Sequence, residues 1–369
     1  MATLYFHIPF CRRICTYCDF YKVGATELLP HVVEVMHQEL EERCTTLHSK
    51  ALTSIYFGGG TPSLMPPSEI EGLIEHARRL FDCSSVTEIT IEANPDDLTE
   101  EYVAELRKTS VNRLSLGIQS FDNRVLEFMN RRHTAEEAEE AVRRLRRAGY
   151  DNLSVDVIFG VAGFGDTLTE TLRRAIALDV EHISAYHLTV EERTRLGLLV
   201  KRGEYMPIVD EESEREFLAV HTSLEDAGYE HYEVSNFAKR GRRAEHNSAY
   251  WTGVEYLGIG PGAHSFTGDE RRWCVSTAKQ YSEGVITFED EQLSERDRLN
   301  EYVMTSLRRV EGIDLDYVEQ RFGCGERRRI ERAAKEWVAS GVVRAEGSTL
   351  AISVKHFLVS DAVIETLFA

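Results

Sequence analysis

Short apolar segments alternate with amphipathic segments over the first half of the chain. Each apolar segment has the length of a strand, and each amphipathic segment repeats its apolar residues at helical spacing. Strands that alternate with helices form a parallel sheet with right-handed crossovers, and the chemistry of such a sheet lies at the carboxyl ends of its strands. We therefore predict an α/β fold whose motifs gather at one edge, with strands over residues 4–7, 54–57, 88–92, 113–117, 153–159 and 182–188 and helices over residues 28–40, 68–80, 100–107, 135–148 and 169–178.

The alternation of strands and helices ends near residue 204. A charged helical stretch over residues 210–227 leads, after an extended segment, to a glycine-rich run over residues 256–265. From about residue 294 the pattern predicts two helices and then a hairpin around residues 346–348, which is the order of a small winged-helix-like α+β domain. We predict three parts: a barrel over residues 1–200, a barrel extension over residues 201–290, and a C-terminal domain over residues 291–369.

Composition narrows the classes of function. The net charge of −19 disfavours a nucleic-acid binder, because such affinity needs a basic surface. We therefore expect the winged-helix-like domain to have a structural or partner-docking role. No apolar run approaches the ~20 residues of a spanning helix, and no basic segment followed by an apolar one marks the start of the chain. The seven cysteines fit a reducing compartment, so we expect a cytoplasmic protein.

Cys11, Cys15 and Cys18 stand in one short run at C-x3-C-x2-C spacing. Thiolates are soft ligands that suit iron–sulfur clusters. Three thiols can bind three irons of a four-iron, four-sulfur (4Fe-4S) cluster and leave the fourth iron open to a small molecule. A structural zinc site normally has four closed ligands, so a zinc site here would need His7 or His31 as well. Thiols that cluster by chance are the remaining alternative.

Two further motifs follow predicted strands. The run GGGTPS over residues 58–63 follows the second strand, and its glycines let the backbone turn tightly and approach a ligand. Taken alone, a glycine triplet is most often just a turn. Glu92 stands at the tip of the third strand, where a carboxylate can accept hydrogen bonds from ribose hydroxyls. The alternative role for Glu92 is a cap on the helix near Leu98.

The cysteine spacing resembles that of the radical S-adenosylmethionine (SAM) superfamily. Residues 5–11, YFHIPFC, are similar to the first strand of its oxygen-independent coproporphyrinogen oxidase branch, which includes the HemW heme chaperones. In that superfamily the open iron binds the amino and carboxylate groups of SAM, and an electron from the cluster can cleave SAM to a 5'-deoxyadenosyl radical. The resemblance implies a partial (β/α)6 barrel followed by the winged-helix-like domain.

The resemblance also implies which residues contact SAM. Arg131 stands where the family has a ligand arginine, and a guanidinium can clamp a carboxylate with two parallel hydrogen bonds. Gln119, Arg131 and Asp156 correspond to a second SAM site of the oxidase branch, and binding of a second SAM here is a hypothesis. The implied cofactor-binding residues are Tyr5, Tyr17, Gly59, Gly60, Thr61, Glu92, Gln119, Arg131 and Asp156.

Two features separate the oxidases from the chaperones within this branch. The oxidases carry a further cysteine two residues past the third one, where this chain has Phe20, and they have an extension ahead of the first strand. Both differences favour the chaperones. The loop after the fifth strand departs from the pattern of the family. Residues 160–167 read GVAGFGDT, where relatives usually have Gly-Leu-Pro-Gly-Gln-Thr. The resemblance therefore does not predict the shape of this fifth loop or any substrate contact that it makes.

The run HNSAYW over residues 246–251 resembles the heme-binding signature H-N-x-x-Y-W of the HemW chaperones. A neutral imidazole of His246 can ligate heme iron, and Tyr250 and Trp251 offer flat apolar faces to the macrocycle. The basic segment over residues 239–243 could meet the heme propionates. Judged without the resemblance, a loop histidine that forms hydrogen bonds and a solvated basic loop are the ordinary interpretations.

We therefore predict a protein that holds a 4Fe-4S cluster and SAM, carries heme as cargo with His246 as ligand, and delivers it to client hemoproteins such as respiratory cytochromes. We do not expect nucleic acid as a partner. We do expect the protein to associate transiently with the membrane and to form a homodimer. The first alternative is oxidative decarboxylation of the propionates of coproporphyrinogen III by the adenosyl radical. The second is a radical SAM methyltransferase or cyclopropanase on the same scaffold.

Overall fold

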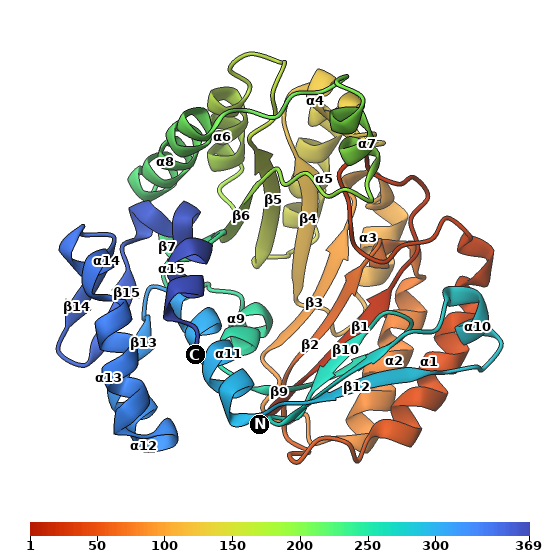
Figure 1. The fold of residues 1–369 in the computed structure, drawn as a ribbon. Coiled ribbons are helices and arrows are strands. Elements are labelled where there is room, and N and C mark those ends of the chain that lie inside the picture. The colour runs from red at the N-terminus through yellow and green to blue at the C-terminus, as the bar shows by residue number, and fades with distance from the viewer.

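The computed structural model describes residues 1–369 and contains one large and one small sheet. The large sheet has twelve strands in the order β12-β11-β10-β9-β1-β2-β3-β4-β5-β6-β8-β7, and its centre is six parallel strands that curve into a partial barrel (Figure 1). The α/β prediction is confirmed, and all six predicted strands are present. They are β1 (Ala2–Ile8), β2 (Leu52–Gly59), β3 (Glu88–Ala93), β4 (Arg113–Gln119), β5 (Leu153–Phe159) and β6 (His182–His187).

Helices connect these strands and cover the outer face of the sheet (Figure 1). The sequence signals that start them are visible: Thr134 and Glu137 form a reciprocal capping box at the start of the helix over Ala135–Arg147. The predicted helices are confirmed within a few residues at each end. The helices of the barrel are α1 (Leu29–Arg43), α2 (Pro67–Leu80), α3 (Glu100–Leu106), α4 (Asn123–Phe128), α5 (Ala135–Arg147) and α6 (Leu168–Ala177).

The barrel strands are apolar on their outer face and polar on their inner face. Leu4, Phe6 and Ile8 of β1 are fully buried in the main hydrophobic core, which the helices complete from outside. Residues between them face the other way, because successive strand side chains point to opposite faces. On the inner face Ser115 of β4 donates a hydrogen bond to Asp156 of β5. The hydrophobic core therefore lies between sheet and helices, and the interior of the barrel is free for polar chemistry.

Two groups of strands that the sequence pattern did not separate extend the barrel at its edges. Beside β1 lie β9 (Glu255–Ile259), β10 (His264–Phe266), β11 (Glu270–Cys274) and β12 (Phe288–Gln292). Beside β6 lie β8 (Asn236–Ala238) and β7 (Glu230–Glu233), which are antiparallel to it. The chain between β6 and β9 also forms α7 (Arg195–Lys201), α8 (Asp210–Asp226) and α9 (Glu245–Trp251), and α10 (Ala278–Ser282) precedes β12.

The C-terminal part folds around the small sheet, with strand order β13-β15-β14. Its order is helix, strand, three helices, hairpin and a last helix, which is winged-helix-like but has one strand and three helices more than the sequence pattern indicated. The buried side chains of Leu299, Val318 and Ile330 join its core. The elements are α11 (Glu295–Leu307), β13 (Ile313–Asp314), α12 (Leu315–Phe322), α13 (Cys324–Ala333), α14 (Lys335–Ala339), β14 (Val343–Glu346), β15 (Thr349–Ile352) and α15 (Ser360–Leu367).

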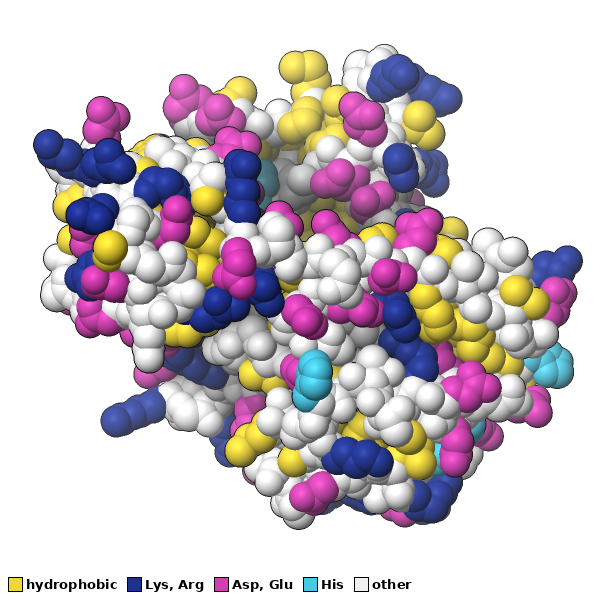
Figure 2. Space-filling view, turned by 60° about the horizontal axis from the view of Figure 1, so that its bottom comes forward, with side chains coloured by type: hydrophobic (Ala, Val, Ile, Leu, Met, Phe, Trp, Pro, Cys, Tyr) yellow, Lys and Arg dark blue, Asp and Glu magenta, His cyan; other side chains and the backbone are white.

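Acidic and basic side chains are intermingled over the face of the molecule shown in Figure 2. Many of the arginines pair with neighbouring carboxylates, as Arg308 does with Asp361 at 2.7 Å. Among the helices, none combines the length and the apolar character that crossing a bilayer requires.

Candidate cofactor site

A cavity of about 510 Å³ opens at the carboxyl ends of the barrel strands. Its wall combines the cysteine loop that follows β1, the glycine loop that follows β2, and polar side chains from β3, β4 and β5. Most of the residues that the sequence assigns to the cluster and to SAM meet here: Cys11, Cys15, Cys18, Tyr17, Gly59, Gly60, Thr61, Glu92, Gln119, Arg131 and Asp156.

The three cysteines are free thiols, partly exposed to this cavity. The Cys11 thiol accepts a hydrogen bond from Thr61 at 3.5 Å, and the Cys15 thiol accepts one from Arg131 at 3.3 Å. Burial raises the pKa of Cys11 and of Cys18, as a low-dielectric site does to any thiol without a metal. Three thiols on one loop, beside cationic and hydroxyl donors, fit the ligand set of an iron–sulfur cluster.

The geometry disfavours the zinc alternative. The ring nitrogens of His7 are both engaged, Nδ1 with the Tyr5 hydroxyl at 3.0 Å and Nε2 with the Tyr21 carbonyl oxygen at 3.3 Å. His31 is exposed on α1.

The glycine loop needs its glycines. Gly59 has a φ of 112°, a conformation that side chains rarely adopt. At Gly60 a Cβ would come within 2.8 Å of the Phe10 carbonyl oxygen, so only glycine lets this loop touch the cysteine loop. The next residue, Thr61, accepts a hydrogen bond from Asn94 at 3.3 Å, which ties the loop to the end of β3.

Glu92 faces the cavity from the end of β3. One carboxylate oxygen accepts the Tyr56 hydroxyl at 2.9 Å, and the other accepts the backbone amide of Gly59 at 3.1 Å. Burial raises the pKa of Glu92 to about 7, with Asp156 adding to the rise. The capping alternative is wrong, because α3 is capped by Thr99, which accepts a hydrogen bond from the Tyr102 amide. A carboxylate oxygen can accept more than one hydrogen bond, so Glu92 at the wall of the cavity suits a ligand with hydroxyl groups.

Gln119 and Arg131 leave polar atoms without partners. Gln119 has a φ of 73°, which is uncommon for a residue with a side chain, and its Oε1 is buried without a hydrogen bond. Arg131 donates to Asn94 at 2.6 Å and to the Gly117 carbonyl oxygen, while its Nε is buried and unpaired. Buried polar atoms normally have partners. A polar ligand in the cavity would supply them, so these residues fit the SAM site that the resemblance implies.

Of the two tyrosines that the resemblance assigns to the cofactor, only Tyr17 borders the cavity, and Tyr5 does not. Tyr17 borders the cavity between the cysteines. Tyr5 lies deeper in the barrel, with its ring 6.0 Å from that of Tyr56 and its hydroxyl on His7, and it does not border the cavity. A contact of Tyr5 with a cofactor in the cavity would therefore be indirect.

His246 does not join the other predicted residues. It lies on α9 at the amino ends of the strands, where its backbone amide donates to Glu88, the first residue of β3. The imidazole is buried, with Nδ1 2.8 Å from the Ser54 hydroxyl and Nε2 3.2 Å from the Tyr250 hydroxyl. Burial lowers its pKa to about 3, so the ring is neutral. In this arrangement neither ring nitrogen is available to an axial iron.

The other segments discussed for substrate contact are also engaged elsewhere. In the basic segment, Lys239 pairs with Asp179 at 2.5 Å and Arg243 pairs with Glu311 at 2.8 Å. In the unusual fifth loop, the Gly160 amide donates to Glu216 of α8 at 2.7 Å. None of residues 160–167 borders the cavity. The loop is therefore anchored to α8 rather than to the site.

Several residues that border the cavity were not predicted from the sequence. Asn94 joins the glycine loop to Arg131, and Ser115 donates to Asp156 at 3.2 Å. Tyr186 and His187 close the far side from the end of β6. A signal was available, because Ser115 and Tyr186 stand at inward positions of strands that the pattern had already predicted.

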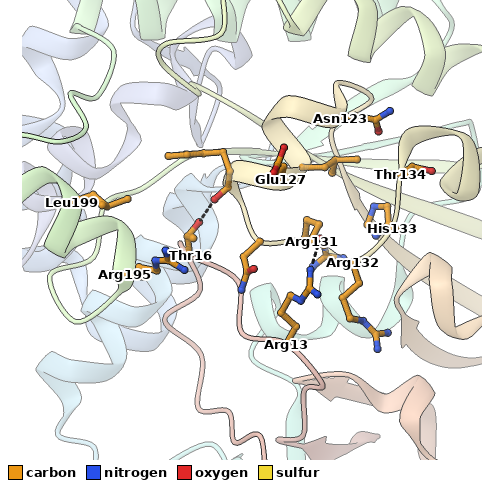
Figure 3. A pocket seen from close by; sticks show the side chains of 13 residues that line it. Arg13, Thr16, Asn123, Glu127, Arg131, Arg132, His133, Thr134, Arg195 and Leu199 are labelled. Carbon is orange, nitrogen blue, oxygen red and sulfur yellow. Dashed lines mark hydrogen bonds between the residues drawn. The ribbon is translucent and has the colours of Figure 1, made fainter.

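A second hollow, of about 720 Å³, lies on the other side of the Arg131 backbone (Figure 3). Arg13, Arg131 and Arg132 cluster on one side of it, and Thr16 donates to the Phe128 carbonyl oxygen at 3.1 Å on the other. Arg132 is held by the carboxylates of Asp96 and Asp97.

Comparison with known proteins agrees with this geometry. The family model of the radical SAM superfamily matches residues 5–175, and that of the HemN C-terminal domain matches residues 293–355. The chain is 32% identical to the heme chaperone HemW of Bacillus subtilis, over 88% of this chain and 87% of the relative. It is 33% identical to heme chaperone HemW of Mycobacterium tuberculosis, over 99% and 94%.

The fold also has a solved counterpart. Coproporphyrinogen III oxidase (HemN) from Escherichia coli superposes with a TM-score of 0.83 at 21% identity, over 100% of this chain and 90% of that one. At this identity the match concerns the fold alone.

Proposed function

This chain belongs to the HemW family of the radical SAM superfamily, and from that premise we propose that it is a heme chaperone, which binds heme and delivers it to hemoproteins. The support is the similarity to curated relatives that carry this name, together with a cavity in which thiols, a carboxylate and a guanidinium converge. The similarity to these relatives supports the chaperone role, and the convergence in the cavity supports the binding of a cluster and SAM.

In the proposal Cys11, Cys15 and Cys18 hold a 4Fe-4S cluster, whose open iron would supply a binding point for SAM and an electron. The glycine loop, Gly59 to Thr61, borders the ligand. Glu92 borders the cavity and accepts the ribose hydroxyls of SAM, because each carboxylate oxygen can accept a further hydrogen bond. Arg131, Gln119 and Asp156 complete the polar wall, and Tyr17 closes it beside the cysteines.

The heme ligand remains a separate hypothesis. An axial bond from His246 requires its imidazole to leave Ser54 and Tyr250, and therefore requires α9 to move away from the strands. Tyr250 and Trp251, on the same helix, would accompany it. In our proposal heme is bound in such an opened state and is released when α9 returns.

We further propose that the protein works in the cytoplasm, visits the membrane surface to supply cytochromes, and forms a homodimer when loaded. The parts over residues 1–200, 201–290 and 291–369 would then serve cofactor binding, heme handling and partner docking. Gel filtration with and without heme tests the homodimer, because a loaded dimer would elute earlier than the heme-free chain.

A heme transfer assay tests the function. Anaerobically reconstituted protein is loaded with heme and mixed with a heme-free membrane cytochrome, and the Soret absorbance of both is followed. We expect transfer to the cytochrome. The same preparation is given coproporphyrinogen III, SAM and a reductant, and carbon dioxide is measured. Robust release of carbon dioxide would overturn the chaperone proposal in favour of the oxidase, whose fold this chain shares.

A further inference from the structure

Helix α9 closes the amino end of the barrel. Its N-cap residue, Ala244, has no side chain that could cap it. Glu88 of β3 does so instead and accepts the backbone amides of Glu245 at 2.9 Å and His246 at 3.1 Å. The start of the H-N-x-x-Y-W segment is thereby fixed to the strand whose other end carries Glu92, ~13 Å away along the strand.

The imidazole of His246 fits this position closely. A neutral imidazole has one donor and one acceptor, and the hydroxyls of Ser54 and Tyr250 can serve either. The ring also stacks on Tyr56, with the ring centroids 4.8 Å apart and the planes at 27°. The contacts with Ser54, Tyr250 and Tyr56 together fix the orientation of the His246 ring.

Tyr56 connects this ring to the cavity. Its hydroxyl donates to Glu92 at 2.9 Å, and the second oxygen of Glu92 holds the amide of Gly59 at 3.1 Å. Tyr56 also has Tyr5 on its β1 side, with the ring centroids 6.0 Å apart. Because His246 stacks on the Tyr56 ring, it restricts where the hydroxyl of Tyr56 lies, and hence where Glu92 lies.

We propose that His246 is a positioning residue of the SAM site, which acts through Tyr56 on Glu92. The inference rests on the proposed binding of SAM in the cavity. It gives the histidine of the H-N-x-x-Y-W segment a role in the closed barrel that is distinct from ligation of iron. It also links the segment at the amino end of the strands to the cofactor at their carboxyl end.

The linkage predicts a specific pattern of SAM affinity. Removing the imidazole in His246→Ala frees the Tyr56 ring, and Tyr56→Phe removes the hydroxyl that Glu92 accepts. Each change should weaken SAM binding about 3- to 10-fold, because each disturbs a hydrogen bond to a charged acceptor. Since both act on the same bond, the double variant should be no weaker than the weaker single variant.

The test measures the dissociation constant of SAM by equilibrium dialysis on anaerobically reconstituted protein, with iron content and the electron paramagnetic resonance (EPR) spectrum of the reduced cluster recorded for each variant. Thr252→Ser, an exposed change just past α9 that keeps the hydroxyl donated to the last turn of the helix, is the matched control and should match the unaltered protein. Ser54→Ala, which removes the partner of Nδ1, carries the test if His246→Ala does not fold.

The outcomes separate the inference from the proposed function. Weaker SAM binding with unchanged iron content and a non-additive double variant supports the inference. Additive losses, or unchanged SAM affinity in His246→Ala and Tyr56→Phe, overturn it while the proposed function stands. Loss of heme binding in His246→Ala with unchanged SAM affinity also overturns it and favours the axial ligand. If the unaltered protein does not bind SAM, both fall.

Discussion

Arg131 places a guanidinium nitrogen 3.3 Å from the Sγ of Cys15, although the two residues are 116 positions apart in the chain. The same guanidinium donates to Asn94 and to the carbonyl oxygen of Gly117. One side chain thus joins the cysteine loop to the polar wall contributed by β3 and β4. The cluster ligands and the proposed SAM ligands are parts of one site.

Arg131→Lys should weaken SAM binding about tenfold while the cluster is retained. Lysine keeps the positive charge near Cys15 but has no planar fork that could contact Asn94, Gly117 and a ligand carboxylate together. Equilibrium dialysis and iron analysis measure the two properties. Arg143→Lys, at an exposed ion pair on α5, is the control and should change neither. A full loss of iron in Arg131→Lys would contradict the proposed role.

SAM binding should depend on the protonation of Glu92. Burial and the nearby Asp156 raise its pKa to about 7, although the hydrogen bonds from Tyr56 and Gly59 lower it. The ionised carboxylate is the better acceptor for ribose hydroxyls. The affinity should therefore rise by up to about tenfold per pH unit as the pH approaches 7 from below, and then level off.

Glu92→Gln tests this dependence. It should weaken SAM binding by about 10- to 100-fold at neutral pH, because a charge-assisted acceptor is lost. The affinity of the variant should be flat between about pH 5.5 and pH 8.5. An unaltered pH profile in the variant would show that another group titrates.

The stability of the protein should fall in acid through His246. Its pKa is about 3 in the folded chain, against an ordinary value of 6.5, so the unfolded chain binds a proton first as the pH decreases. The neutral imidazole of His246 makes its full contribution to the free energy of unfolding above pH 6.5, and this contribution is lost as the pH falls toward 3. Glu92 and Glu233, whose pKa values are raised to about 7 by burial, act in the opposite direction.

Comparison with His246→Gln isolates that contribution. The variant should be less stable than the unaltered protein at pH 7. On acidification its free energy of unfolding should fall less steeply than that of the unaltered protein, with a difference of up to about 1.4 kcal/mol per pH unit. Urea unfolding at several pH values measures both. Parallel pH profiles for the two proteins would mean that the imidazole is not buried in neutral form.

Arg132 should matter for stability rather than for binding. It pairs with Asp96 and, at 2.7 Å, with Asp97, whose second oxygen accepts the Ser63 hydroxyl at 3.0 Å. Removing the guanidinium leaves the buried Asp97 carboxylate without its main partner. Arg132→Ala should lower the free energy of unfolding by about 2 kcal/mol. Arg143→Ala, at an exposed pair, should change it by less than about 0.5 kcal/mol.

The sequence predicted the barrel and most of the site because its signals are local. Strands such as β1 alternate strictly between core residues and inward polar residues, and Cys11, Cys15 and Cys18 lie within eight positions. The position of Glu92 followed once β3 was predicted. Parallel strands bring their carboxyl ends to one edge, so these motifs could only meet there.

The sequence could not place His246, because its surroundings are formed by distant residues. Ser54 and Tyr56 precede it by about 190 positions, and nothing in the run HNSAYW indicates that its helix enters the barrel. A histidine beside aromatic residues fits an exposed ligand and a buried hydrogen-bonding residue equally well. The strands beside β1 were missed because short edge strands such as β10 carry little pattern, whereas the extended segment predicted ahead of the glycine-rich run overlaps β7.

The most direct test of the central claim is the EPR spectrum of the reduced, anaerobically prepared protein before and after addition of SAM. We expect a 4Fe-4S signal that changes when SAM is added and that is absent when Cys11, Cys15 or Cys18 is replaced by alanine. A preparation that contains zinc or bare thiols instead, or a cluster signal that SAM leaves unchanged, would contradict the assignment of these cysteines and of the cavity beside them.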